Sequence, residues 1–155
     1  AMDDTRLVIT NDGWENVEAT DVVTVHDYSK YGENFAEKYR APKDDLYPMW
    51  KRLMAFGEHL PDLPVMISEY GGITVSKDGG WGYSGAEKGE EDFLKRFEKL
   101  NENAFSGVFC GVCYTQLTDV EKETNGLLDE RHNPKYSVSA IREIMDKFDE
   151  KEKIL

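Results

Sequence analysis

The sequence predicts an α/β fold built on a parallel sheet, because a short apolar run, a polar loop and a helical pattern follow one another repeatedly. Four runs are the expected strands, at residues 7–10, 22–25, 65–68 and 107–114. Their continuous apolarity indicates strands that are buried on both faces. Apolar residues at helical spacing follow the last three of these strands, at residues 46–60, 93–105 and 138–148. The connection from Glu15 to Asp21 is too short for a crossover helix.

Length and composition indicate a single domain or one piece of a larger one. The chain has 155 residues, of which 39% are hydrophobic and 12% are aromatic, and this is enough for a packed core. Its net charge of −12 argues against nucleic acid and anionic membranes as partners. No apolar run reaches the roughly 18 to 20 residues of a membrane span, and no signal peptide is recognisable in the chain. We therefore expect a soluble protein, with the cytoplasm the favoured location.

No cofactor, metal or disulfide is predicted. Cys110 and Cys113 lie three residues apart in an expected strand, which points their side chains to opposite faces and favours buried free thiols over a redox motif. Residues 146–155 are highly charged and are expected to fray. One acidic group fits no calcium-loop spacing and is best explained as a solvated loop: Asp119, Glu121, Glu123 and Asp129.

The unusual polar and aromatic residues all follow expected strands, where the loops of a βα fold form the site. Glu69 comes directly after the third strand and precedes two glycines that allow close backbone approach. Taken alone, Glu69 is either catalytic or a structural residue that pairs with an arginine or caps a helix. The other residues at these strand ends are Asn11, Asp12, Trp14, His26, Tyr28, Trp81, Tyr114 and Gln116. A functional cleft at this edge of the sheet is therefore predicted.

Three sequence blocks, in the same order along the chain, carry a family resemblance. Residues 64–72 (PVMISEYGG) resemble the nucleophile strand of glycoside hydrolase family 2, the β-galactosidase, β-glucuronidase and β-mannosidase family. Residues 21–28 (DVVTVHDY) and 114–121 (YTQLTDVE), with short matches at 125–127 and 133–135, extend the resemblance over nearly the whole chain. The resemblance implies a (β/α)8 TIM barrel. Residues 1–155 would be its C-terminal portion, about four βα units with strands five to eight, or half a barrel.

By this resemblance Glu69 is the catalytic nucleophile, and Tyr28 is the tyrosine that hydrogen-bonds the nucleophile and keeps it ionised and oriented. Without the resemblance, Tyr28 is also explained as an amphipathic residue at the rim of the barrel. The family's proton donor is a Glu after an Asn at the end of the fourth strand. The one Asn-Glu pair in this sequence, Asn101-Glu102, lies in a predicted helix. Because retaining glycosidases need two carboxyl groups, the chain alone is expected to hydrolyse little or nothing.

Substrate contacts are expected from loop aromatics and from groups that hydrogen-bond sugar hydroxyls. Trp81, and less favourably Trp14, either stacks on a pyranose ring or plugs the barrel mouth. His26 either binds a sugar hydroxyl or is a structural hydrogen-bonding residue. Tyr114 lies near the position where the family commonly has a tryptophan on the eighth strand. The remaining expected hydroxyl contacts are Asn11, Asp12 and Gln116.

The leading hypothesis is a fragment of a retaining β-glycosidase that acts on terminal β-linked sugars through a glycosyl-enzyme intermediate on Glu69. Glucuronidase-type members carry an Asn-x-Lys pair after the eighth strand, and residues 121–126 (EKETNG) lack it, which favours a β-galactosidase-like preference. One alternative is a noncatalytic carbohydrate-binding or assembly module. Another is a subunit completed by a second copy or by an N-terminal half barrel, since half a barrel leaves sheet edges unpaired.

Overall fold

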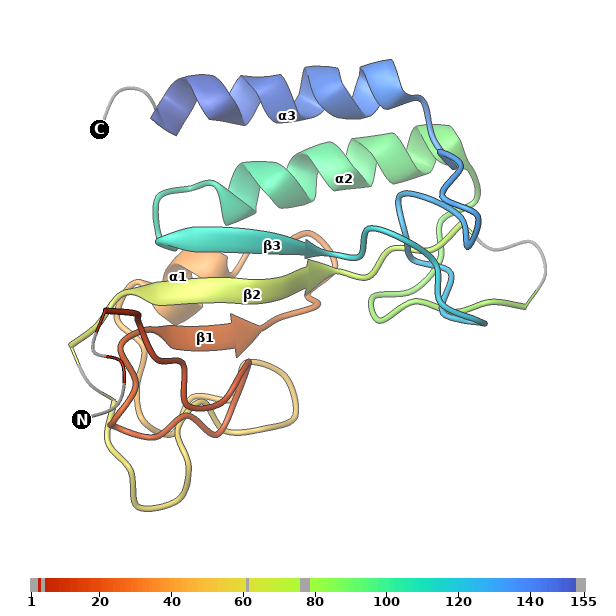
Figure 1. Cartoon of the computed structure of the whole chain (residues 1–155). Helices are drawn as coiled ribbons and strands as arrows, with labels where there is room; N and C mark the ends of the chain where they lie inside the picture. Colours follow the sequence, from red (N-terminus) through yellow and green to blue (C-terminus); the bar gives the residue numbers. More distant parts are fainter. Residues whose placement is uncertain (1–2, 4, 61, 76–78, 153–155) are drawn as a thin grey trace.

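Three βα units form the frame of the protein within the part of the chain that the computed structural model describes, residue 3 and residues 5–60, 62–75 and 79–152. The sheet is parallel, with the strand order β1 (Val23–His26), β2 (Val65–Gly71) and β3 (Gly111–Thr115). The helices that follow these strands are α1 (Phe35–Tyr39), α2 (Glu90–Ala104) and α3 (Val138–Glu152). Figure 1 shows α2 against the sheet and α3 alongside α2.

Most of the predicted elements are present. β1 and β2 confirm the second and third expected strands, and β3 corresponds to the later part of the fourth. α2 and α3 confirm the last two expected helices. α3 continues to Glu152, and residues 153–155 lie outside the described residues, so the frayed tail expected at residues 146–155 stays a prediction. None of the described helices has the length and apolarity that crossing a membrane requires.

The predicted strand at residues 7–10 is wrong, although this segment does lie beside β1. Val8 O accepts the backbone N–H of Asp21, just before β1, at 2.8 Å, and Gly13 O accepts the N–H of His26 at 3.1 Å. Between these two hydrogen bonds, a side chain takes the place of the backbone partner: the N–H of Gly13 donates to Thr24 Oγ1 at 2.8 Å. Hydrogen bonds from side chains to the backbone compete with sheet pairing, so the segment follows β1 without becoming a strand.

The predicted helix at residues 46–60 is also wrong, since this segment is irregular and the helix of this connection is the short α1 upstream. The apolar spacing is helical, but Pro48 and Gly57 interrupt it, the latter with φ of +85°. A proline inside a helix costs about 3 kcal/mol, and glycine is also unfavourable there. Leu53 instead enters the core from the loop, whereas Trp50 is 59% exposed.

One face of the sheet is covered by helices, and the other presents the polar residues. Ile67 and Tyr70 are both buried in the helix-side core, and Tyr70 donates to Asn101 of α2 at 2.6 Å. The β2–β3 register shifts between Ile67 and Tyr70, as at a β-bulge. The two residues between them, Ser68 and Glu69, therefore both project from the other face.

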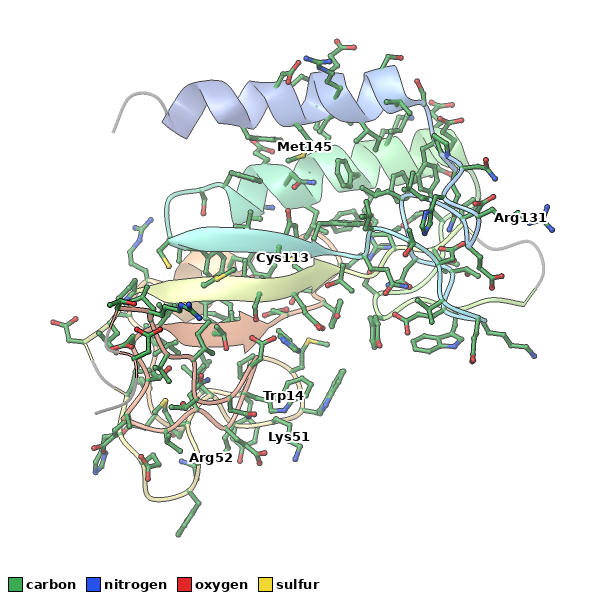
Figure 2. All side chains as sticks on the ribbon, viewed as in Figure 1. Trp14, Lys51, Arg52, Cys113, Arg131 and Met145 are labelled. Atoms are coloured by element: carbon green, nitrogen blue, oxygen red, sulfur yellow. The ribbon has the colours of Figure 1, made fainter. Side chains whose placement is uncertain are left out.

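Both cysteines are exposed, so the expectation of buried thiols is wrong. Figure 2 labels Cys113 on β3, where its neighbour Tyr114 packs on the helix side. Alternation along the strand therefore places Cys113 on the opposite face. That face is not covered at β3 by the described residues, and a strand buried on one face alone leaves its other side chains accessible.

Candidate active site

Glu69 lies at the carboxyl end of β2, where His26, the last residue of β1, and Tyr28, just after β1, reach its carboxylate. The Tyr28 hydroxyl donates a hydrogen bond to Glu69 Oε2, and His26 Nδ1 lies 3.2 Å from the same oxygen. Parallel pairing explains the approach, since His26 and Glu69 are register partners and Asp27 N donates to Glu69 O at 3.0 Å. The structure thus brings together the two residues predicted to be catalytic, with His26 beside them.

Asp12 extends this group on the far side of the imidazole. His26 Nε2 lies 3.0 Å from Asp12 Oδ2, and Ser68 Oγ donates to Asp12 Oδ1 at 2.6 Å. Partial burial raises the pKa of Asp12, but the hydrogen bonds from Ser68 and His26 outweigh this effect, and the net pKa is below its ordinary value. Asp12 is therefore hydrogen-bonded to His26, whose other ring nitrogen lies close to Glu69. The expected Asp12 and His26 contacts to sugar hydroxyls stay predictions.

Tyr28 is held as a hydrogen-bond donor by its surroundings. Burial first, and then the bond to Glu69, raises the pKa of Tyr28 well above its ordinary value, so the phenol keeps its proton. The Tyr28 ring stacks on Tyr83 at 4.5 Å, and the edge of Trp81 packs on Tyr83 at 5.1 Å. Tyr83 was missed by the sequence analysis, although its place in the glycine-rich loop of Trp81 was a usable signal.

The buried carboxylate of Asp27, which lies between His26 and Tyr28 in the sequence, fixes the backbone at the end of β1. Asp27 is fully buried and accepts hydrogen bonds from Lys38 at 2.8 Å and from the Tyr39 hydroxyl at 2.7 Å, both from α1. Asp27 also accepts the N–H of Ser29 at 2.8 Å. A buried charge needs such partners, and here they hold the backbone from which His26 and Tyr28 project.

Arg96 of α2 anchors the loop that carries Tyr83. Its side chain is 2% exposed and donates to Ser84 O at 2.9 Å, to Lys30 O at 2.9 Å and to Glu87 at 3.1 Å. The Ser84 hydroxyl in turn donates to Gly71 O at the end of β2. The loop that stacks Tyr83 on Tyr28 is thus anchored to α2 and to the end of β2.

Three of the expected substrate contacts have other partners. Asn11 is exposed, and its amide donates to Trp14 O at 2.5 Å, which shapes its own loop. Gln116 donates to Asn125 Oδ1 at 3.1 Å and braces the loop after β3. Tyr114 packs on the helix side, 5.1 Å from Phe97 between ring centroids, and is not brought to Glu69. The side of the sheet on which Tyr114 lies depends on the β2–β3 register, which the sequence does not reveal.

One group among the described residues has donor atoms close enough for a metal ion, since one ligand atom each from Asp12, His26 and Glu69 lies within 4.8 Å of the others. Each nitrogen of the imidazole faces a different carboxylate, with Nε2 hydrogen-bonded to Asp12 at 3.0 Å and Nδ1 lying 3.2 Å from Glu69. The acidic group after β3 is also engaged internally. Asp119 accepts both Lys135 and the N–H of Gly126.

The Asn-Glu pair of the sequence does not supply a second catalytic carboxyl group at Glu69. Asn101-Glu102 lies in α2, where Asn101 is buried against Tyr70 and Glu102 pairs with Lys99. Asp12 is near enough to Glu69 for a retaining pair, which needs a separation of about 5 Å. A general acid must hold a proton, however, and the lowered pKa of Asp12 keeps it ionised.

Comparison with solved structures reveals the same fold within glycoside hydrolases. The chain is similar to an exo-β-agarase, with 18% identity and a TM-score of 0.53, over 83% of this chain and 16% of that one. It is also similar to a β-galacturonidase of glycoside hydrolase family 2 from Eisenbergiella tayi, in structures with glycerol and with galacturonate. These give 16% and 17% identity and a TM-score of 0.54, over 84% of this chain and 24% of those chains.

The chain spans a quarter or less of the length of these proteins, and at such identities the likeness is one of fold. No protein-family model and no curated protein matches the sequence.

Proposed function

We propose that this chain is the C-terminal half of the catalytic barrel of a retaining β-glycosidase of glycoside hydrolase family 2, with Glu69 as the nucleophile. The observation that carries the proposal is the hydrogen bond from Tyr28 to Glu69 at the carboxyl ends of two neighbouring parallel strands. Loops at this edge form the site in βα barrels. The fold shared with an exo-β-agarase and a family 2 β-galacturonidase supports the relation to this family.

The chemistry would be a double displacement. Glu69 attacks the anomeric carbon, the bond to the leaving oxygen breaks, and a glycosyl-enzyme ester forms that water then hydrolyses. Tyr28 and His26 orient the attacking carboxylate. The acid that protonates the leaving oxygen would come from the other half of the barrel. We therefore expect little or no hydrolysis of nitrophenyl β-galactoside by the isolated chain, and a rate near that of a complete family member would contradict this.

Exposed apolar surface supports the half-barrel assignment. Leu7, Val8 and Ile9 are 76%, 50% and 46% exposed, although they form an apolar run of the kind that a sheet buries. Cys113 is exposed on the sheet face opposite the helices. Such surfaces are normally covered by another element or another chain. The same observation favours the second candidate, a subunit completed by a second copy or by a separate half barrel, which sedimentation at high concentration would detect as a larger mass.

A neutral sugar, as in a β-galactoside, is the proposed substrate. Within the described residues, the partners of Glu69 are a phenol and an imidazole, and no lysine or arginine pairs with Glu69, Asp12 or Tyr28. Recognition of a sugar carboxylate usually employs a cation, above all arginine. The site as built from this chain therefore suits hydroxyl groups better than a uronic acid.

The nucleophile can be tested separately from the missing acid. A 2-deoxy-2-fluoro-β-galactoside with a dinitrophenolate leaving group needs no protonation when that group departs, and the fluorine slows hydrolysis of the ester. Incubation should attach one fluoroglycosyl group to the chain, and peptide mass spectrometry should place it on Glu69.

Glu69→Gln should abolish this labelling, whereas Glu102→Gln, at a surface pair of α2, should not. Labelling elsewhere, or none, would contradict the assignment. Sugar binding without labelling would favour the noncatalytic carbohydrate-binding module.

A further inference from the structure

Two tryptophans form an aromatic pair beside Glu69. The ring centroids of Trp14 and Trp50 are 5.9 Å apart, and Trp50 is 59% exposed. Trp14 and His26 pack edge to face with centroids 4.9 Å apart, and His26 Nδ1 is 3.2 Å from Glu69. Figure 2 shows Trp14 next to the carboxyl end of β1, with Lys51 from the loop of Trp50 close by. One imidazole thus separates the pair from the proposed nucleophile.

The loops that carry these tryptophans are fixed to each other. Glu15 N donates to Arg52 O at 2.8 Å, and Asn16 N donates to Leu53 O at 2.9 Å. The Asn16 amide adds bonds to Leu53 O at 3.0 Å and to Thr24 O at 3.1 Å, and both Asn16 and Leu53 are fully buried. The aromatic pair is therefore preorganised, which reduces the entropy lost on binding.

The backbone between Trp14 and Asn16 is strained. Glu15 has φ of +48°, in the left-handed region that residues other than glycine rarely adopt. Such conformations cost about 1–3 kcal/mol and cluster at binding and active sites, where the surrounding structure imposes them. Here the conformation lets Asn16 enter the core while Trp14 stays against His26.

We propose that Trp14 and Trp50 form a platform for a second sugar ring, next to the ring attacked at Glu69. The substrate class would then be a β-linked oligosaccharide of at least two sugars. This inference rests on the proposed function, because Glu69 fixes where the first ring lies. The C–H face of a pyranose suits an aromatic surface. Glu15 and Lys51, which pair at 3.4 Å and each follow one of the tryptophans, supply polar groups for hydroxyls at its rim.

Binding can be followed on the indole N–H signals of the three tryptophans by NMR. The 155-residue chain is titrated with methyl β-galactoside and with β-1,4-galactobiose. We expect the disaccharide to bind about tenfold more tightly, a gain of the size that one aromatic contact provides, and to shift the Trp14 and Trp50 signals. Trp50→Ala should reduce disaccharide affinity to that of the monosaccharide. Phe56→Ala is the matched control, because it removes a 92% exposed ring from the same loop.

Equal affinity for the two sugars, a disaccharide gain that survives in Trp50→Ala, or no binding of either sugar would overturn the platform. If the alanine variant folds poorly, Trp50→Leu keeps an apolar side chain without the aromatic face and should show the same loss of disaccharide affinity. Labelling by the activated fluorogalactoside separates the two proposals. If Glu69 is labelled but the disaccharide binds no more tightly than the monosaccharide, only the platform is rejected. If the disaccharide binds more tightly in a way that depends on Trp50 but Glu69 is not labelled, the nucleophile is rejected and the platform is retained.

Discussion

The hydroxyl of Tyr28 donates to the carboxylate of Glu69 across 41 residues of sequence. Parallel pairing of β1 with β2 places the two strand ends side by side, and the buried Asp27 fixes the backbone from which Tyr28 projects. Because burial and the bond to Glu69 raise the pKa of Tyr28, the phenol remains the donor. The orientation of the carboxylate is thus imposed by the neighbouring strand.

Tyr28→Phe should slow labelling of Glu69 by the activated fluorogalactoside by about 10- to 100-fold, since a hydrogen bond to a charged group contributes about 1.5–3 kcal/mol. The phenylalanine ring can still stack on Tyr83, so the fold should persist. Intact-mass time courses measure the rate. Tyr31→Phe, at a tyrosine that is 38% exposed, is the control and should label like the parent chain. Equal rates for the two variants would show that the Tyr28 hydroxyl does not act on Glu69.

Gly13 is predicted to be essential to the position of His26. A Cβ at Gly13 would lie 2.3 Å from the His26 ring, and φ there is +87°. Gly57 has φ of +85° with open space around it, so Gly57→Ala measures the backbone strain alone, about 1–2 kcal/mol. Gly13→Ala should cost about 1–3 kcal/mol more in urea unfolding, because the ring must move. It should also slow labelling of Glu69, and similar losses for both variants would refute the steric argument.

The sheet and the position of Glu69 at its edge were predictable, whereas the groups that contact Glu69 were only partly so. Continuous apolar runs identified β1 and β2, and the parallel arrangement placed Tyr28 near Glu69. The β-bulge that turns both Ser68 and Glu69 to one face has no simple sequence signal. For the same reason the sequence could not show that Tyr114 faces α2.

The wrong predictions of a strand at residues 7–10 and of a helix at residues 46–60 arose where local hydrogen bonding or backbone geometry outweighed the apolar pattern. Thr24 replaces ladder hydrogen bonds beside the expected first strand, which a pattern of apolar residues does not report. Trp50 has the spacing of a helix face, yet Pro48 and Gly57 prevent the helix and leave the ring exposed. The hydrogen bond between Asp12 and His26 joins a loop to the end of β1, and such contacts depend on tertiary structure.

Arg96 should contribute strongly to stability. Its 2% exposed guanidinium pairs with Glu87, which is 16% exposed, and holds the loop of Ser84. Arg96→Met should lower the free energy of unfolding by about 3–5 kcal/mol, since it leaves the largely buried Glu87 with only the longer contact to Lys30 at 3.9 Å and removes the donors to Ser84 O and Lys30 O. Lys95→Met removes an adjacent surface pair of α2 and should change stability by less than about 1 kcal/mol. Urea unfolding compares them, and a small loss for Arg96→Met would mean that water replaces the guanidinium.

Asp12 should contribute stability that depends on pH. Its pKa is lowered in the folded state, so the contribution is present above the ordinary pKa of about 3.9 and is lost as pH falls through the folded value. Asp12→Asn should therefore be less stable than the parent chain at pH 7, and the difference should be smaller at pH 3, below the ordinary pKa of an aspartate. Because the side chain is 54% exposed, the difference at pH 7 should stay below about 1 kcal/mol. Asp45→Asn, at an exposed aspartate, is the control for removing one negative charge. Urea unfolding at the two pH values measures both variants. A difference that persists unchanged at pH 3 would show that Asp12 does not act through its charged hydrogen bonds to Ser68 and His26.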